Sequence, residues 1–131
     1  MAKSINVVGA VILKDDLVLC AQRSESGTLP GLWEFPGGKI ELNESMQEAL
    51  RREIQEELAC EIAVKSEIAS TIHQYDFGVV SLTTFYCDLV SGTPTASEHA
   101  SIIWLTPEAL FTLEWAPADI PAVAQIQKDL G

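Results

Sequence analysis

Residues 44–58 are the segment that most restricts how this chain can fold. The segment has no glycine or proline and is dominated by glutamate, glutamine, leucine, arginine and alanine, which predicts a helix. Asn43, directly before it, is a suitable N-cap. At about 100° per residue, the long apolar side chains share one face that should pack against a core. These side chains belong to Met46, Leu50, Ile54 and Leu58.

Three glutamates of this segment lie at or beside its apolar face. Glu57 falls within the apolar stripe, Glu53 at its edge and Glu56 one step further round. Carboxylates so close together repel, and a partly buried carboxylate is costly without a partner. Arg52 is adjacent, but one arginine cannot neutralise three acids. A hard divalent ion such as Mg²⁺ or Mn²⁺ could do so. The alternative is a solvated acidic face with salt bridges inside the helix.

The sequence Pro36-Gly37-Gly38, shortly before the helix, predicts a break in regular structure. Glycine tolerates positive φ and allows the backbone to approach a ligand closely. A carbonyl at Gly38 could therefore join the glutamates in holding a metal. A plain turn is the alternative interpretation.

The remaining segments predict strands followed by further helices. Strand-like runs are Ile5–Leu13, Leu17–Arg23, Glu61–Tyr75, Val79–Val90 and Ser101–Leu105, and the first two should form a hairpin. A short helix should begin at Thr106, its cap, and a terminal helix should cover Ala118–Leu130, opened by Asp119. This order indicates an α/β fold with helices packed on a mixed sheet, in one domain spanning residues 1–131.

Composition restricts the partners and the cellular compartment. The net charge of −11 disfavours a nucleic-acid polymer or an anionic membrane as the main partner. An anionic substrate would need a cation to offset the repulsion. The chain has 3 cysteines, widely separated, which disfavours a disulfide framework or a zinc site. The apolar run near the N-terminus is too short to span a membrane. We therefore expect a cytoplasmic protein, either a monomer or a homodimer.

The pattern over residues 38–60 resembles the Nudix box, which is Gly, five residues, Glu, seven residues, then Arg-Glu-aliphatic-x-Glu-Glu-x-Gly-aliphatic. The matching positions here are Gly38, Glu44, Arg52, Glu53, Ile54, Glu56, Glu57 and Cys60. Ala59 replaces the last glycine, where the family helix normally ends in a left-handed turn. Alanine there should cost about 1 kcal/mol or alter the helix end. The stretches "GLWEFPGGKIE" and "WAPADIP" resemble the MutT-like branch, particularly its CTP pyrophosphohydrolase-like members.

The resemblance implies an α/β/α sandwich around a mixed sheet and a hydrolase that uses Mg²⁺ or Mn²⁺. Its MutT-like members convert a nucleoside triphosphate to the monophosphate and pyrophosphate. Transferred to this chain, Glu53, Glu56 and Glu57 would hold metal with the Gly38 carbonyl, and Glu53 would be the general base. Glu98 resembles a glutamate that some relatives bring to the same metals, although it could be a plain loop acid. Arg52 and Glu44 would orient the catalytic glutamates.

The resemblance also suggests substrate contacts. Arg23 and Lys39 are candidate phosphate ligands, or else solvated surface charges. Phe35 could line the base pocket and Tyr75, with Phe77, could stack on the base, but each could equally be core or sheet packing. Asp119 would read the base edge by accepting from an exocyclic amine, or by facing a guanine oxo group if protonated. Alternatively it only caps the last helix. His73 and His99 are expected to be surface or core residues.

Several functions remain open at this stage. The favoured one is cleavage of (d)CTP-like or modified cytosine triphosphates, such as 5-methyl-dCTP, which would clean the nucleotide pool for DNA replication and repair. The second is cleavage of 8-oxo-dGTP. Cleavage of an ADP-sugar or a diadenosine polyphosphate is a further enzymatic option. A non-catalytic nucleotide-binding module is an alternative of another class, which the intact set of Glu53, Glu56 and Glu57 disfavours.

Overall fold

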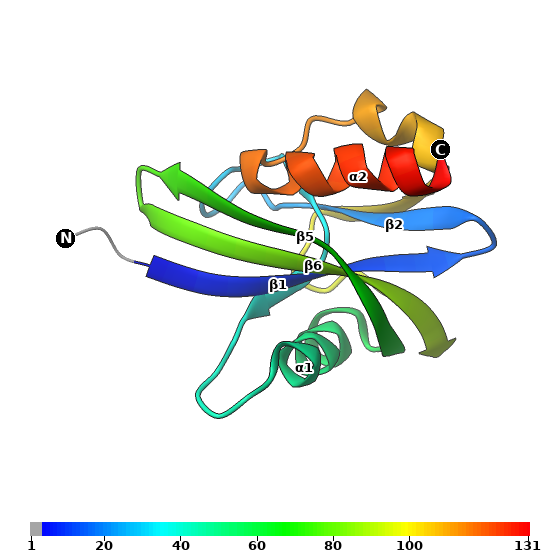
Figure 1. The fold of residues 1–131 in the computed structure, drawn as a ribbon, viewed down its shortest axis with the longest axis horizontal. Coiled ribbons are helices and arrows are strands. Elements are labelled where there is room, and N and C mark those ends of the chain that lie inside the picture. Colours follow the sequence, from blue (N-terminus) through cyan, green and yellow to red (C-terminus); the bar gives the residue numbers. More distant parts are fainter. Residues whose placement is uncertain (1–3) are drawn as a thin grey trace.

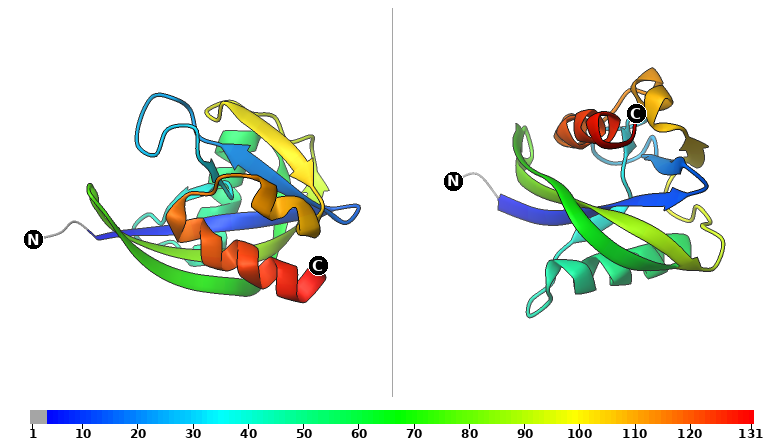
Figure 2. Two further views of the ribbon diagram at one scale, coloured as in Figure 1. Left: turned by 90° about the horizontal axis from the view of Figure 1, so that it is seen from above. Right: turned by 45° about the vertical axis from the view of Figure 1, so that its right-hand side comes forward.

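A mixed β-sheet with helices on both faces forms the centre of the protein. The structure is a computed structural model that describes residues 4–131; residues 1–3 of the predicted domain lie outside that range. Helix α1 (Met46–Leu58) covers one face of the sheet and α2 (Ile120–Leu130) the other (Figure 1, Figure 2). The predicted α/β/α sandwich around a mixed sheet is therefore confirmed. No helix between residues 4 and 131 combines the length and apolar character needed to cross a membrane.

Within residues 4–131 the sheet has seven strands, and two 3₁₀ helices precede the terminal helix. The strands are β1 (Ser4–Lys14), β2 (Leu17–Gln22), β3 (Trp33–Glu34), β4 (Gly37–Lys39), β5 (Glu61–Tyr75), β6 (Gly78–Ser91) and β7 (Ser101–Leu105). The 3₁₀ helices are η1 (Pro107–Thr112) and η2 (Pro117–Asp119).

Strand β1 is the centre of the topology. It pairs in parallel with β6 from Ser4↔Val79 to Leu13↔Asp88. Strand β6 in turn forms an antiparallel hairpin with β5, the strand before it in the chain. The predicted hairpin between β1 and β2 exists, but only Leu13 and Lys14 pair across it. Beyond that point β2 leaves β1 and pairs with β3 and β7. The separation of β1 from β2 leaves room for β4 on the β1 edge.

The prediction of a break at Pro36-Gly37-Gly38 is wrong for the two glycines. They form β4, which pairs antiparallel with β1 through Val8↔Gly38 and Gly9↔Gly37. A Cβ atom on Gly37 would lie 1.9 Å from the Val8 carbonyl oxygen. Glycine is required here because a residue without a side chain lets the two backbones approach closely. It is not required to form a turn.

Helix α1 begins two residues later than predicted, and its cap is Ser45 rather than Asn43. The Ser45 hydroxyl accepts from the Glu48 amide at 3.1 Å, and the Glu48 carboxylate accepts from the Ser45 amide at 2.8 Å. This reciprocal capping box satisfies two amides at once, which a single asparagine cannot do. Asn43 instead lies in the preceding turn with a φ of 67°.

The C-terminus of α1 keeps the left-handed turn despite the missing glycine. Ala59 adopts φ 55° and ψ 39°, and its amide donates to the Gln55 carbonyl. The alanine thus occupies a conformation that suits glycine better. The sequence left two outcomes open, a strained left-handed turn or a different helix end, and the structure has the strained turn.

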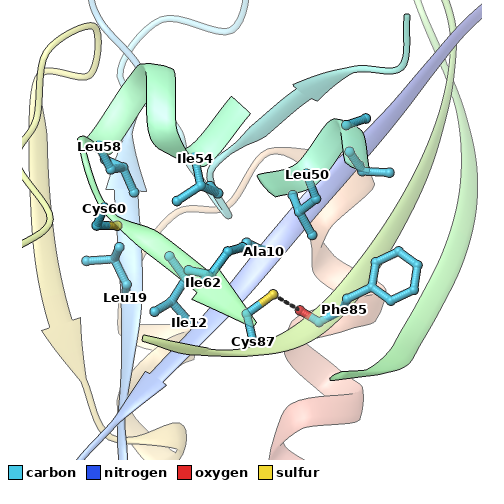
Figure 3. Packing of buried hydrophobic residues seen from close by; sticks show 12 residues of the cluster. Ala10, Ile12, Leu19, Leu50, Ile54, Leu58, Cys60, Ile62, Phe85 and Cys87 are labelled. Atoms are coloured by element: carbon cyan, nitrogen blue, oxygen red, sulfur yellow. Dashed lines mark hydrogen bonds between the residues drawn. The ribbon is translucent and has the colours of Figure 1, made fainter. Parts of the chain in front are cut away.

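Two apolar clusters lie on opposite faces of the sheet, and β1 contributes alternate residues to both. Val8, Ala10 and Ile12 pack toward α1, whereas Val11 packs toward α2. Figure 3 shows the cluster under α1, where Leu50, Ile54 and Leu58 meet the sheet. Because β1 is covered on both faces, its sequence is almost continuously apolar.

One residue of the predicted apolar stripe is not in the core. Met46 is 39% exposed, because it is the first residue of α1 and the buried part of the helix begins at Ala49. The short helix after Thr106 is η1, a 3₁₀ helix in which the Thr106 side chain makes no capping bond.

Candidate active site

Arg52 organises the acidic face of α1. Its Nε and Nη2 donate to the two carboxylate oxygens of Glu44 at 2.7 and 2.9 Å, and its Nη1 donates to Glu53 Oε1 at 2.7 Å. Hydrogen bonds from Arg52 lower the pKa of Glu44 to about 2. Glu56 lies further out, at 3.4 Å from Arg52 Nη1. Arg52 and Glu44 therefore lie where a pair that orients Glu53 is expected.

Glu53 lies against the backbone of β4. A Cβ atom on Gly38 would lie 2.4 Å from the carboxylate carbon of Glu53. Glycine at this position leaves the Glu53 carboxylate where it is, and any larger residue would displace it. Arg52 Nη2 also donates to the Lys39 carbonyl at 3.1 Å, which ties β4 to α1. The Gly38 backbone and the Glu53 carboxylate, predicted to share a metal, are thus neighbours.

Glu57 is held in an environment that disfavours its ionised form. Burial, together with the charges of nearby carboxylates, raises its pKa to about 8; these carboxylates are Glu53, Glu34 and Glu98. Within residues 4–131, its Oε2 atom is buried and has no hydrogen-bond partner. A cation next to Glu57 would remove both costs.

The oxygen donors near Gly38 fit a hard divalent ion in charge and in chemistry. The carboxylates here repel one another, and one buried carboxylate oxygen has no hydrogen-bond partner within residues 4–131. Gly38 lies directly against a carboxylate. In the described part of the chain, no three acidic, histidine or cysteine side chains are already grouped closely enough to hold a metal. Arg52 is one reason, because it holds Glu53 and approaches Glu56.

The segment after β6 brings Glu98 to the same region. Ser97 Oγ donates to the Glu57 carbonyl at 2.8 Å, and the Thr95 amide donates to the Leu58 carbonyl at 3.0 Å. These bonds fix the segment to the C-terminal end of α1. Glu98 is exposed, and its charge contributes to the raised pKa of Glu57. We call Glu53, Glu56, Glu57 and Glu98 the acid end of the site.

A pocket of about 610 Å³ extends from the acid end toward α2. Eight of the residues predicted for the site line it: Arg23, Phe35, Gly38, Lys39, Glu57, Tyr75, Glu98 and Asp119. Residues from β3, β4, β5, the segment before β7 and η2 therefore meet in one cavity. Its volume falls in the range usual for small-molecule sites. Four other predicted site residues, Glu44, Arg52, Glu53 and Glu56, are not part of its lining.

The end of the pocket nearest α2 is built around Asp119. Its Oδ1 accepts from the Phe35 amide at 3.1 Å, and its side chain makes no capping bond to α2. The cap interpretation of Asp119 is therefore wrong: the side chain is needed to satisfy a buried amide elsewhere. Burial and the charge of Glu34 raise the pKa of Asp119 well above its ordinary value. The ring of Phe35 packs 4.7 Å from that of Trp115.

Tyr75 completes this wall of the pocket. Its hydroxyl accepts from the Ala118 amide at 2.8 Å. Its ring stacks on Phe77, with centroids 5.0 Å apart and planes 7° apart, and the His73 ring lies at a tilt with its centroid 4.5 Å away. We call Phe35, Tyr75 and Asp119 the base end of the site.

The two basic side chains in the pocket differ. Arg23 Nη1 donates to Glu34 Oε1 at 2.7 Å, and its Nε donates to the Thr28 carbonyl at 2.9 Å. It is therefore held rigidly. Lys39 is exposed at the end of β4 and is free to turn toward an anion.

The sequence interpretation missed Glu34, and it expected His99 to be a surface or core residue without a part in the pocket. His99 Nε2 lies 2.9 Å from Glu34 Oε2, and the His99 side chain is 7% exposed on the pocket wall. It is thus a pocket residue as well as a buried one. The two residues are 65 positions apart, and no local pattern in the chain pairs them.

Comparison with known proteins identifies the family. The family model described as the NUDIX domain matches residues 7–125. The chain belongs to the Nudix family. The "CTP pyrophosphohydrolase" of Escherichia coli K12 is 40% identical to this Nudix chain over 119 residues, which are 91% of this chain and 88% of the relative. The "Putative 8-oxo-dGTP diphosphatase 2" of Mycobacterium tuberculosis is 35% identical, over 99% of this chain and 92% of the relative.

A solved structure agrees with this Nudix assignment. The solution structure described as DNA mismatch repair protein MutT of methicillin-resistant Staphylococcus aureus 252 superimposes with a TM-score of 0.81. It is 54% identical, and the match covers 98% of this chain and 99% of that one. The chain is a Nudix hydrolase that acts on nucleotides. This finding rules against the non-catalytic binding module.

Proposed function

We propose that this Nudix hydrolase converts a nucleoside triphosphate to the monophosphate and pyrophosphate, with (d)CTP-like or modified cytosine nucleotides as its preferred substrates. The observation that carries the proposal is the single pocket that joins the acid end to the base end. A nucleotide has the same division, with an anionic chain at one end and a planar base at the other. The similarity to a CTP pyrophosphohydrolase supports the choice of base.

Nudix hydrolases generally use divalent metal ions. Here we propose Mg²⁺ or Mn²⁺, held by the Gly38 carbonyl, Glu53, Glu56, Glu57 and Glu98. When bound, such an ion offsets the charge of the phosphates and makes a water molecule easier to deprotonate.

The protein's own side chains would divide the remaining work. Glu53, half-buried beside Gly38 and aligned by Arg52, would take the proton from the attacking water. Arg52 would in turn be held by the bidentate contact to Glu44. Arg23 and Lys39 would contact the phosphates, Arg23 from a position fixed by hydrogen bonds and Lys39 from an exposed one.

The base end would provide recognition. Phe35 and Tyr75 offer apolar and aromatic surface for a planar base. Asp119 Oδ1 is engaged by the Phe35 amide, so the rest of the carboxyl group is available to the base edge. A neutral carboxyl group can both accept from an exocyclic amine and donate to a ring nitrogen or an oxo group.

A second candidate substrate is 8-oxo-dGTP. It is favoured by the similarity to putative 8-oxo-dGTP diphosphatases and by the raised pKa of Asp119, because a protonated acid can donate to an oxo group. For either substrate we propose a role in cleaning the nucleotide pool, in the cytoplasm. The 3 cysteines are free and buried, as suits a reducing compartment.

A substrate panel tests the proposal. All canonical ribo- and deoxyribonucleoside triphosphates, 5-methyl-dCTP, 8-oxo-dGTP, ADP-ribose and a diadenosine polyphosphate would be offered with Mg²⁺ and then with Mn²⁺. Products would be identified by chromatography. The expected result is monophosphate plus pyrophosphate, with the highest kcat/KM for a cytosine nucleotide. A preference for 8-oxo-dGTP would select the second candidate, and cleavage of ADP-ribose alone would contradict both.

A further inference from the structure

We propose that Glu34 recognises the sugar of the nucleotide by accepting a hydrogen bond from a sugar hydroxyl, and that His99 is the positioning residue that holds Glu34 for this purpose. The inference rests on the proposed function, since it assumes that a nucleotide spans the pocket from the acid end to the base end.

Glu34 lines the pocket near residues of both of its ends. It lines the same cavity as Asp119 at one end and Glu57 at the other. Its negative charge acts at both ends, where it helps to raise the pKa of Glu57 and the pKa of Asp119. Between the phosphates and the base of a nucleotide lies the sugar. Glu34 is therefore the pocket side chain placed to meet it.

The chemistry of Glu34 restricts what it can bind. Hydrogen bonds from His99 and Arg23, with the charge of Arg23, outweigh the effect of burial and hold the pKa of Glu34 below its ordinary value. An ionised carboxylate only accepts hydrogen bonds. It cannot bind a phosphate, which it repels. In the stretch between base and phosphates, the only donors that a nucleotide offers are its sugar hydroxyls.

Both oxygens of Glu34 are already fixed from the protein side. Oε1 accepts from Arg23 Nη1 at 2.7 Å and Oε2 accepts from His99 Nε2 at 2.9 Å. The Glu34 side chain is nevertheless 21% exposed, toward the pocket that it lines. Each carboxylate oxygen has a second acceptor position. The two protein bonds thus fix the direction in which the remaining acceptor positions point.

His99 is in turn fixed by the segment that carries it. The Ala100 amide donates to the Gln22 carbonyl at 2.9 Å, and Ser97 Oγ donates to the Glu57 carbonyl at 2.8 Å. The His99 side chain is 7% exposed, and no hydrogen-bond partner for its Nδ1 is found among residues 4–131. Because the partner of Nε2 is a carboxylate, Nε2 is the donor in this bond, and its visible effect in the fold is to hold Glu34.

The test compares the protein variants with substrates that lack single hydroxyls. Wild-type protein, Glu34→Ala and Glu34→Gln would be assayed on CTP, dCTP, 3′-deoxy-CTP and 2′,3′-dideoxy-CTP. Loss of the recognised hydroxyl should lower the wild-type kcat/KM by roughly 10- to 100-fold, mainly through KM, as expected for a hydrogen bond to a charged group. In Glu34→Ala the same pair of substrates should differ by less than about 3-fold. The CTP–dCTP pair reports on the 2′-hydroxyl, and the dCTP–dideoxy-CTP pair on the 3′-hydroxyl.

His99 has its own pair of variants. His99→Phe, which removes the donor, should reduce the discrimination between hydroxyl and deoxy substrates, and His99→Gln, which retains a donor, should restore it. Adding His99→Phe to Glu34→Ala should cause no further loss of discrimination, because the two residues act as one unit. Glu108→Ala, an exposed acid in η1 away from the pocket, is the matched control.

Two results would overturn the proposal. One is a wild-type protein that treats the four sugars alike, and the other is a Glu34→Ala variant that loses the same factor on all four. Binding of the four corresponding monophosphates, measured by calorimetry without turnover, gives the same comparison independently of hydrolysis. A failure of the proposed function would be distinct, because it would appear as absence of triphosphate cleavage by wild-type protein.

Discussion

At the scale of single residues, the carboxylates of the site are held in different states. The bidentate bond to Arg52 lowers the pKa of Glu44 and keeps it ionised, whereas the pKa of Glu57 is raised to about 8. The Glu53 carboxylate lies directly against Gly38. One fold thus prepares neighbouring acids for different tasks. Orientation, charge compensation and proton transfer can be separated by substituting them one at a time.

Glu53→Gln tests the proton-transfer role. The amide keeps the shape of the side chain but cannot take a proton, so kcat should fall by at least ~10²-fold. Circular dichroism and Tm should remain close to wild type, because Arg52 keeps its contacts to Glu44. Glu108→Gln, on the exposed side of η1, serves as control. Turnover of Glu53→Gln within a few-fold of wild type would remove Glu53 from the mechanism.

Asp119→Asn tests base recognition. Asparagine keeps an oxygen that can accept from the Phe35 amide, but it always carries donors, whereas the carboxyl group donates only when protonated. The ranking of bases by kcat/KM should therefore change more than the activity on the best substrate. Asp15→Asn, in the turn after β1, is the matched control. An unchanged ranking across all bases would limit Asp119 to holding Phe35.

The acids that the sequence identified in α1 share one property, which is that their relation is local. Glu53, Glu56 and Glu57 fall at fixed spacings within one helix, so periodicity is enough to bring them together, whereas Gly38, Glu98 and Asp119 are assigned with the help of the resemblance to the Nudix family. The pairing of Glu34 with His99 depends on the register of β2 with β3 and with β7. No local pattern contains that register, and so this pair had to come from the structure.

At the scale of elements, the same distinction separates α1 from β4. The uninterrupted helix-forming residues of α1 predict it correctly to within two residues at its start. The two glycines of β4 carry no strand propensity, and they form a strand only because β1 approaches closely enough to exclude any side chain. The propensity of a short edge segment is thus overridden by the backbone beside it.

The end of α1 gives a prediction about stability. Ala59 is exposed and adopts φ 55°, so Ala59→Gly should stabilise the protein by about 1 kcal/mol. Ala124→Gly, an exposed residue inside α2, is a matched control with the opposite sign and should cost about 1 kcal/mol. Urea unfolding monitored by circular dichroism measures both changes. A loss of stability in Ala59→Gly would mean that the left-handed turn is not strained by alanine.

At the scale of the whole molecule, the acid end makes stability depend on pH when no metal is present. The pKa of Glu57 is about 8 in the fold, well above that of an unfolded glutamate. The fold therefore binds this proton more tightly than the unfolded chain does. Glu57 stabilises the metal-free protein fully at acidic pH, and this contribution is lost as the pH rises through about 8.

Thermal melts in EDTA test this dependence. Glu57→Gln is uncharged at every pH, so the Tm of wild type relative to the variant should fall between about pH 5 and pH 9. After a discount for the partial exposure of Glu57, the fall corresponds to on the order of 1 kcal/mol, or about 4 °C. Glu108→Gln should follow the wild-type profile. A constant difference in Tm between wild type and Glu57→Gln would contradict the raised pKa.

The parallel pairing of β1 with β6 also has a consequence for how the chain acquires its fold. The main partner of the first strand is Val79–Asp88, so the ladder at the centre of the sheet cannot form until a large loop has closed. During synthesis α1 follows β1 and β4 but leaves the ribosome before β5 and β6, which complete the sheet beneath it. The glutamates of its inward face therefore remain in water until the second half of the chain arrives, and the metal site is assembled late, by the same step that closes the sheet.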